Sequence, residues 1–158
     1  MKIDESHWLT DINKVASPYY DERPEGEDIS LLVVHHISLP PRQYGGTFVD
    51  DFFAGNLDHT LHPFFEVIKN LKVSAHCLIR RTGEVVQFVP FDKRAWHAGV
   101  SSFAGRKRCN DYSIGIELEG CEFDSYTPEQ YDSLIELTKL LQSQYPKMSD
   151  HRITGHQY

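Results

Sequence analysis

The stretch Leu31–Ile37 reads LLVVHHI, a short apolar run that is rich in β-branched residues and ends in two histidines before its last isoleucine. Such a run is typical of a β-strand that is covered on both faces. Pro40 and Pro41 follow it and predict its end, since proline cannot donate a backbone hydrogen bond to a sheet. Gly45 and Gly46 make the next loop pliable. We therefore expect a buried strand that leads into a loop able to line a pocket.

Further strands are predicted along the chain after this run. Residues 74–81 (SAHCLIRR) and 84–89 (EVVQFV) flank a short turn with a glycine, which is typical of a β-hairpin. Residues 94–98 and 113–120 (SIGIELEG) are expected to form two more strands. The order of the strands in a sheet cannot be read from these patterns.

Helical spacing of apolar residues occurs in three segments. Residues 127–145 open with TPEQ, a capping box with proline at the first helical position. Residues 48–53 and 63–71 also have helix-like spacing. Strands combined with a long helix indicate an α/β or α+β domain. At 158 residues the chain fits one domain, which can bury roughly 70% of the surface that its unfolded form exposes.

Charge and composition restrict the partners and the compartment. The net charge of −7 disfavours a nucleic acid or an anionic membrane as partner. Residues 1–10 (MKIDESHWLT) carry acids where a signal peptide would be apolar, and no segment approaches the length of a membrane span. The three cysteines show no CxxC spacing, so reduced thiols are expected. We therefore expect a cytoplasmic protein.

The histidines are the first residues that point to chemistry. The nine of them are His7, His35, His36, His59, His62, His76, His97, His151 and His156. Alternation places His35 and His36 on opposite faces at the end of a buried strand, where sheets usually present ligands. His156 follows Gly155, which lets the backbone approach a site closely. The alternatives are a hydrogen-bonded core histidine for the strand pair and a surface residue for His156.

Two carboxylates lie on the strand predicted over residues 113–120. Alternation puts Glu117 and Glu119 on the same face as the small residues Ser113 and Gly115. A carboxylate in that setting must face a polar cleft or be neutralised. Such a cleft would raise the pKa of Glu117 towards the range useful to a general base. A solvated sheet face is the alternative, and it suits Glu119 better than Glu117.

Two other segments are candidates for binding a substrate. Residues 94–99 (RAWHAG) set Trp96 beside His97 and small residues, a combination that suits a sugar or peptide groove, although Trp96 could equally be a core residue. Residues 106–108 (RKR) form a basic cluster in a loop. An arginine there could hold a substrate carboxylate in bidentate fashion, or the cluster could be a solvated turn.

Four motifs support a resemblance to a known family: LLVVHHISLPP, VSAHCLIRRTGEVVQFVPFDKRAWHAGVSSF, GRKRCNDYSIGIELEG and ITGH. Together they resemble the AmpD-type 1,6-anhydro-N-acetylmuramoyl-L-alanine amidases, which belong to the amidase family that includes peptidoglycan-recognition proteins. The similarity runs nearly from end to end. It implies a mixed α/β domain with a central mixed β-sheet flanked by helices. It also implies zinc-dependent hydrolysis of the amide between anhydro-N-acetylmuramic acid and L-alanine during cell-wall recycling.

The resemblance also implies roles at the reaction centre. His35 and His156 match two zinc ligands, and Glu117 matches the catalytic carboxylate. The family supplies an aspartate as third ligand and a catalytic lysine beyond the Gly-His motif, whereas this sequence ends at Tyr158. A catalytic zinc site normally has three protein ligands and a water. We therefore expect residues 1–158 to be a single amidase domain truncated at its C-terminal end, poor in metal and in activity.

Substrate contacts are implied in the same way. Arg108 matches a residue that holds a carboxylate of the stem peptide. Lys72 stands where relatives carry arginine. Lysine keeps the positive charge but lacks the planar guanidinium fork of arginine. His36 stands where relatives place asparagine, and we expect it to bind substrate together with Trp96 and His97. The implied partner is a small anhydromuramoyl peptide, with no nucleic acid and no membrane, and the implied state is a monomer.

Three other functions stay open. The chain could be a metal-poor module that binds peptidoglycan fragments without turnover. It could be a secreted lytic amidase, which the missing signal segment and the negative charge disfavour. It could also be a metal-free hydrolase with Cys77 or Cys109 as nucleophile, although buried thiols are usually inert.

Overall fold

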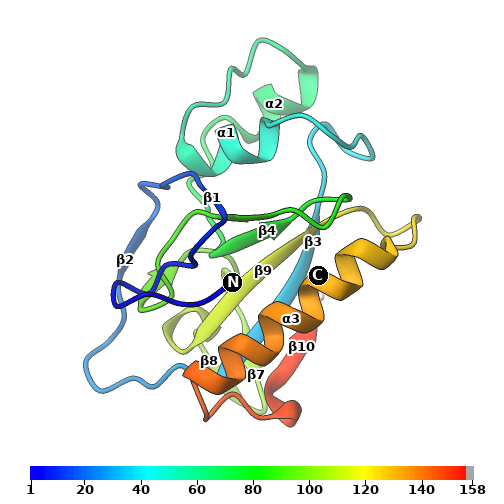
Figure 1. Cartoon of the computed structure of the whole chain (residues 1–158). Coiled ribbons are helices and arrows are strands. Elements are labelled where there is room, and N and C mark those ends of the chain that lie inside the picture. Colours follow the sequence, from blue (N-terminus) through cyan, green and yellow to red (C-terminus); the bar gives the residue numbers. More distant parts are fainter. Residues whose placement is uncertain (156–158) are drawn as a thin grey trace.

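The computed structural model describes residues 1–155 as a mixed β-sheet with helices packed on it (Figure 1). Across these residues the main sheet has six strands, in the order β1 (Asn13–Lys14), β5 (Val85–Gln87), β4 (Cys77–Ile79), β9 (Ser113–Glu119), β3 (Leu31–Ile37) and β10 (Ile153–Gly155). Strand β9 runs parallel to β3 and β4, β10 runs parallel to β3, and β5 runs antiparallel to β4. The predicted mixed α/β fold is confirmed.

The two central strands, β3 and β9, have the alternation that the sequence predicts. They are paired in register from Leu31 opposite Ser113 to Ile37 opposite Glu119. Even-numbered side chains such as Leu32 and Ile114 belong to the core beneath the long helix α3 (Pro128–Gln144). Odd-numbered side chains therefore leave the sheet on the opposite face. That opposite face is called the site face below.

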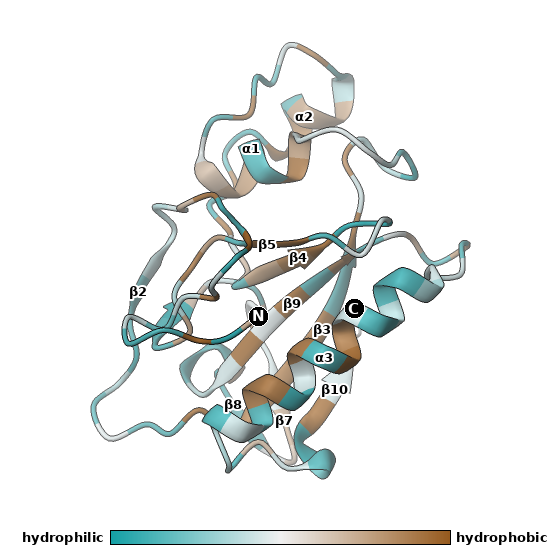
Figure 2. Cartoon of the chain, viewed as in Figure 1, coloured by the Kyte–Doolittle hydropathy of each residue, from teal (hydrophilic) through white to brown (hydrophobic). Residues whose placement is uncertain are grey.

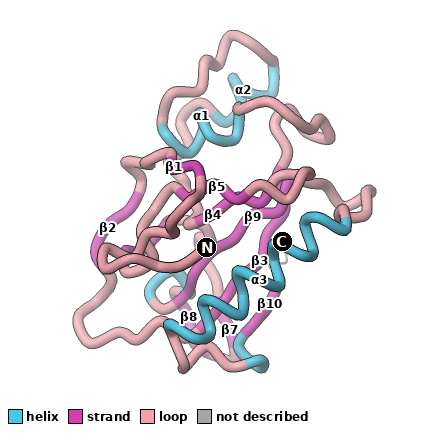
Figure 3. Tube along the Cα trace, viewed as in Figure 1, coloured by secondary structure: helices cyan, strands magenta, loops and turns pink. Residues whose placement is uncertain are grey.

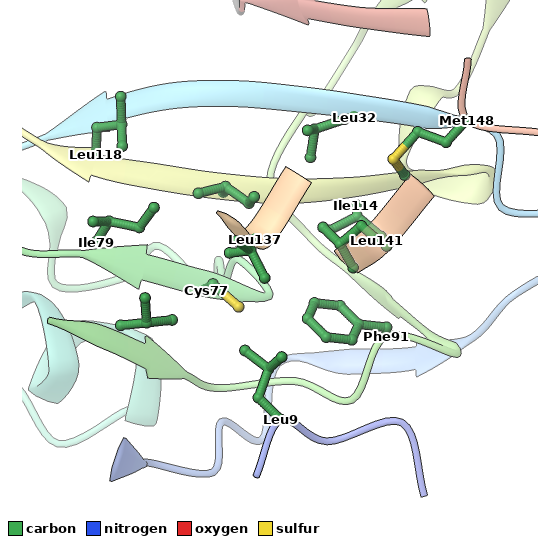
Figure 4. Packing of buried hydrophobic residues seen from close by; sticks show 12 residues of the cluster. Leu9, Leu32, Cys77, Ile79, Phe91, Ile114, Leu118, Leu137, Leu141 and Met148 are labelled. Carbon is green, nitrogen blue, oxygen red and sulfur yellow. The ribbon is translucent and has the colours of Figure 1, made fainter. Parts of the chain in front are cut away.

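Helix α3 covers the first face of the sheet. Its N-terminus carries the predicted capping box, in which Thr127 accepts a hydrogen bond from the Gln130 amide and the Gln130 side chain accepts one from the Thr127 amide. Leu137 and Leu141 are fully buried and point towards Ile114 and its neighbours (Figure 4). In Figure 2 this helix carries both hydrophobic and hydrophilic residues, while β4 and β5 are strongly hydrophobic. The helix thus buries one side against the sheet and leaves the other in water.

Two short helices pack on the site face at the β4 and β5 end. Helix α1 (Phe48–Ala54) contributes Phe52 and Phe53, and helix α2 (Pro63–Ile68) contributes Phe65, to a core with residues of β4 and β5. His62 caps α2 by accepting the Phe64 amide at 3.0 Å. Both helices lie near one end of the sheet in Figure 1. Beside β3, Leu31 and Val33 pack on the site face with Ala98, Cys109 and Tyr112.

The remaining elements are short and joined by long loops (Figure 3). They are β2 (Tyr20–Glu22) paired with β6 (Lys93–Ala95), β7 (Ser102–Phe103) paired with β8 (Arg106–Lys107), and the 3₁₀ turns η1 (Cys109–Asp111) and η2 (Asp150–Arg152). Helix α2 is shorter than the predicted segment 63–71, and Leu71 is 53% exposed in the loop that follows. Within residues 1–155 no helix has the length and apolar character needed to cross a membrane.

Candidate active site

His35 and Glu117 lie next to each other on the site face. They are direct partners in the parallel register of β3 and β9. Both are odd-numbered positions, so both side chains leave the sheet on the same face. His35 is 4% exposed and Glu117 is 8% exposed. An imidazole and a carboxylate are therefore held side by side on two rigid, buried strands.

The carboxyl group of Glu117 has an unusual environment. Burial raises its pKa to about 8, because removal from water disfavours the charged form. Among residues 1–155 its Oε2 atom has no hydrogen-bond partner. A buried carboxylate of this kind is stabilised by a cation placed beside it. The group is thus suited to exchange a proton near neutral pH and to sit next to a positive charge.

His97 reaches the same place from the loop after β6. Its Nδ1 lies 2.8 Å from Nε2 of His35, and its Nε2 lies 3.0 Å from Oγ of Ser113. The ring lies over Gly115, where a Cβ atom would be only 2.4 Å from Cγ of His97. The glycine and serine of β9 therefore make room for this imidazole and contact it.

A third histidine, His76, is a structural residue of the kind that the sequence left open as an alternative. It is fully buried, its Nδ1 accepts the Gly115 amide at 3.1 Å, and its Nε2 donates to the Lys93 carbonyl at 2.9 Å. Burial and the charge of nearby Arg23 lower its pKa to about 3, so it stays neutral. His76 fixes the strand that carries the site and carries no charge of its own.

Trp96 and Arg108, two predicted substrate residues, line one shallow pocket of about 290 Å³. The other residues of this pocket are Arg94, Gly99, Asn110 and Asp111. Trp96 is partly exposed, and its indole Nε1 donates to Asp21 at 3.2 Å, so it is not a core residue. Asn110 joins this pocket to the reaction centre, since its Oδ1 accepts the backbone amide of His97 at 3.2 Å.

Two other predicted substrate residues, Lys72 and His36, are not brought to this place. Lys72 is exposed in the loop after α2. His36 is the even-numbered neighbour of His35, opposite Leu118 in the register, and so points to the α3 face. This position gives no support to the predicted contact between His36 and the substrate. His156 lies outside the described residues.

A larger cavity of about 680 Å³ lies along β3 and β10. It is lined by Leu31, Val33, Ala98, Val100, Ser101, Ser102, Phe103, Lys107, Cys109, Thr154 and Gly155. Neither His35 nor Glu117 is among its lining residues. The candidate site is therefore defined by its chemistry and not by the size of a cavity.

The cysteines do not have the properties of a nucleophile. Cys77 and Cys109 are both buried. Burial raises the pKa of the Cys77 thiol above its ordinary value, which lowers the fraction of reactive thiolate. The hydrolase with a cysteine nucleophile is therefore disfavoured.

Glu119 corrects one expectation from the sequence. A solvated face was the preferred alternative for this residue, yet it is 4% exposed. Its two carboxylate oxygens accept the backbone amides of Gly45 and Arg81, each at 2.9 Å. The sequence could not reveal these partners, because they come from two loops distant along the chain. Glu119 fastens the loop that follows β3 to the end of β9.

The side chains of residues 1–155 include some of the donor atoms that a zinc ion would need. Across residues 1–155 no group of three His, Cys, Asp or Glu side chains is arranged to bind a metal. His35 is the one predicted ligand in this part, and a neutral imidazole is a usual zinc ligand. The unpartnered Oε2 of Glu117 beside it is an environment that a cation would stabilise. The described residues thus fit one side of a zinc site.

Comparison with known proteins gives consistent results. A family model described as N-acetylmuramoyl-L-alanine amidase matches residues 25–158. The chain is 55% identical to the 1,6-anhydro-N-acetylmuramyl-L-alanine amidase AmpD of Haemophilus influenzae, over 99% of this chain and 85% of that protein. A crystal structure of a selenomethionine AmpD derivative superposes with a TM-score of 0.95 at 56% identity, over 99% of this chain and 86% of that one.

A more distant relative has been solved with a ligand. The structure is the complex of the amidase AmiD from E. coli with the substrate anhydro-N-acetylmuramic acid-L-Ala-D-γ-Glu-L-Lys. It is 27% identical with a TM-score of 0.57, over 85% of this chain and 51% of that chain.

Proposed function

The chain belongs to the N-acetylmuramoyl-L-alanine amidase family, and from this premise we propose that it hydrolyses the amide between 1,6-anhydro-N-acetylmuramic acid and L-alanine in muropeptides. The identity to the Haemophilus AmpD protein over most of both chains supports this substrate. The same similarity supports a role in cell-wall recycling in the cytoplasm. The single observation that carries the proposal is the pairing of His35 with the buried Glu117, whose pKa is raised to about 8 by burial.

Glu117 is the proposed general base and acid. It takes a proton from the attacking water while the new C–O bond forms at the lactyl carbonyl carbon. It then gives that proton to the alanine nitrogen as the C–N bond breaks, since an amine leaves poorly unless it is protonated. A carboxyl group with a pKa of about 8 suits the second step. A cation beside His35 would lower this pKa and leave the group ionised for the first step.

We propose that zinc is that cation, held by His35 and His156 with a further ligand from outside residues 1–155. Zinc held there would lower the pKa of a bound water to about 7 and polarise the carbonyl of the substrate. His35 would contribute an imidazole nitrogen to this site from a buried strand, on which it is 4% exposed. The proposal of zinc rests on the similarity of the chain to the AmpD-type amidases.

Trp96 and Arg108 are the proposed substrate-binding residues. An indole face packs well against a sugar ring, and a guanidinium binds a carboxylate in bidentate fashion. Both groups line one pocket, and Asn110 connects that pocket to the backbone of His97. A muropeptide offers a sugar ring and stem-peptide carboxylates to these two side chains. The substrate of the solved AmiD complex contains the same two parts.

The test is turnover measured together with binding. The purified chain is incubated with anhydromuramoyl tripeptide, with and without added zinc, and the products are separated by mass spectrometry. We expect free tripeptide in proportion to the zinc that the chain holds, which the sequence predicts to be little for residues 1–158, and about 10²–10⁴-fold less per bound zinc from Glu117→Gln. Binding of the muropeptide without any product from the zinc-loaded chain would instead favour a binding module.

A further inference from the structure

We propose that Asp21 is a positioning residue for the pocket that Trp96 and Arg108 line. It anchors the indole of Trp96 and keeps the guanidinium of Arg94 paired, so that Arg108 is left for the ligand. This inference rests on the proposed function, because it concerns the pocket that is proposed to bind the muropeptide. Asp21 is not among the lining residues of that pocket. It acts from the neighbouring strand β2.

The carboxylate of Asp21 holds two side chains that lie on β6 and directly after it. Its Oδ1 accepts the indole Nε1–H of Trp96 at 3.2 Å and the Nε–H of Arg94 at 2.8 Å, and its Oδ2 accepts Nη2 of Arg94 at 2.8 Å. Asp21 and Arg94 are direct partners in the antiparallel pairing of β2 with β6. The hydrogen bond from Arg94 holds the pKa of Asp21 below its ordinary value, so the acceptor stays charged. A charged acceptor makes a stronger hydrogen bond to the indole than a neutral one.

Further contacts from neighbouring segments hold Trp96. Its ring stacks on that of Tyr19, with the centroids 6.2 Å apart and an interplanar angle of 24°. Its backbone amide donates to Oγ of Ser74 at 3.2 Å, and its carbonyl accepts the Ser74 amide at 3.1 Å. Ser74 in turn donates its hydroxyl to the Tyr19 carbonyl at 2.6 Å. The indole is thus fixed before a ligand arrives, and such preorganisation lowers the entropic cost of binding.

Arg94 and Arg108 line the same pocket but have different surroundings. Three nitrogens of Arg94 donate to carboxylates, two of them to Asp21 and Nη1 to Asp111 at 2.6 Å. Within residues 1–155, the exposed side chain of Arg108 makes no hydrogen bond or ion pair. A guanidinium that already binds two carboxylates has few donors left for a third, so Arg108 is the arginine available to a carboxylate of the ligand. The pocket is therefore suited to a ring with one carboxylate beside it.

A purely structural role is the alternative, since the pair of Asp21 and Arg94 also joins β2 to β6. The next position of the same pairing provides a matched control. Glu22 lies opposite Lys93, and its carboxylate pairs with the Lys93 ammonium group at 2.7 Å. Neither of these two residues lines the pocket. Glu22→Ala therefore removes one ion pair between the same strands and leaves the contacts of Trp96 in place.

Two substitutions at position 21 separate the indole contact from the ion pair. Asparagine keeps a carbonyl oxygen as acceptor for Trp96 but loses the charge, whereas alanine removes both. We expect Asp21→Ala to weaken binding of anhydromuramoyl tripeptide about 3–10-fold, the usual worth of one hydrogen bond, and Asp21→Asn to restore most of the affinity. In Trp96→Phe, which lacks the indole N–H, adding Asp21→Ala should weaken binding by less than about twofold.

The measurements are the dissociation constant of the tripeptide, by isothermal titration calorimetry with a chelator present to prevent turnover, and the fluorescence of Trp96. Trp8 and Trp96 are the two tryptophans of the chain, so in a Trp8→Phe background the emission reports on Trp96 alone. Without ligand, Asp21→Ala should shift the emission to longer wavelength and increase its quenching by acrylamide. Asp21→Asn and Glu22→Ala should stay close to the parent chain. Circular dichroism checks the fold of each variant.

The outcomes separate this inference from the proposed function. Unchanged affinity and unchanged emission in Asp21→Ala overturn the positioning role. An equal loss of affinity in Glu22→Ala also overturns it, because strand pairing would then be the cause. A wild-type chain that binds the tripeptide but never hydrolyses it overturns the amidase proposal alone, and a loss of affinity confined to Asp21→Ala still supports the positioning role. A wild-type chain that does not bind the tripeptide overturns both.

Discussion

The side chains of Glu117 and Glu119 leave β9 on the same face, two residues apart, yet they have opposite environments. Glu119 accepts two backbone amides, whereas Oε2 of Glu117 has no partner among residues 1–155. The pKa of Glu117 rises to about 8, because burial disfavours its charged form. One carboxylate is therefore used to hold a loop, and the other is kept available for chemistry.

The environment of Glu117 predicts a pH dependence of stability. Its pKa is about 8 in the folded chain and 4.5 as the ordinary value, so the folded state holds the proton more tightly. Stability of the metal-free chain should fall as pH rises from 4.5 to 8, and Glu117→Gln should remove this loss. At pH 8.5 the variant should be more stable by a few kcal/mol, measured by urea unfolding with a chelator present. Equal stability of the two chains at that pH would contradict the raised pKa.

The environment of His76 predicts that stability depends on pH in the opposite direction at acid pH. Its pKa falls from 6.5 to about 3 on folding, so the unfolded chain binds the proton and stability is lost as pH falls through this window. His76→Gln cannot titrate. It should be less stable at pH 7 by about 1–3 kcal/mol, because the Gly115 amide loses its acceptor, but its stability should fall less steeply towards pH 4. Urea unfolding at several pH values checks this, and parallel curves for the two chains would refute it.

The two hydrogen bonds that Glu119 accepts predict a loss of stability when the loop after β3 is released from it. Glutamine offers one carbonyl oxygen in place of two carboxylate oxygens, so either Gly45 or Arg81 loses its acceptor. We expect Glu119→Gln to destabilise the chain by about 1–3 kcal/mol, with faster hydrogen exchange at the affected amide. Exposed Glu122 provides the control variant Glu122→Gln. A difference between these two variants of under about 0.5 kcal/mol would mean that the loop is held by other contacts.

Arg108 predicts a change in substrate affinity. Lysine keeps the charge but cannot bind a carboxylate in bidentate fashion. Arg108→Lys should raise KM about tenfold and leave kcat nearly unchanged, as expected when uniform binding is lost. The matched control is Arg42→Lys, at an exposed position that stacks on Phe123. A fall in kcat with constant KM would place Arg108 in the reaction itself.

Much of the fold follows from local patterns in the sequence. The run Leu31–Ile37 and the alternation of Ser113–Glu119 predict both central strands and their two faces. The capping box at Thr127 predicts the start of α3. The pairing of β10 with β3 joins segments more than a hundred residues apart, and no local pattern encodes it. The end of α2 at Ile68 was also missed, since apolar spacing continues to Leu71 in an exposed loop.

The candidate site was predictable where a polar or charged residue stands on a strand that is otherwise buried and apolar. Glu117 on a buried strand and His35 at the end of an apolar run are both conflicts of that kind, and the structure places them together. The link from His97 to His35 depends on a loop that folds back over Gly115, so the sequence could indicate only a groove residue. The face that His36 takes was predictable from alternation along the strand, and its contact with substrate stays a prediction.

The most direct test of the amidase proposal is the reaction of zinc-loaded chain with anhydromuramoyl tripeptide in ¹⁸O-labelled water. The account predicts that one ¹⁸O atom enters the lactyl carboxylate of anhydro-N-acetylmuramic acid, that the released tripeptide is unlabelled, and that Glu117→Gln abolishes most of the label. Cleavage at any other bond, or unchanged labelling by Glu117→Gln, would contradict it.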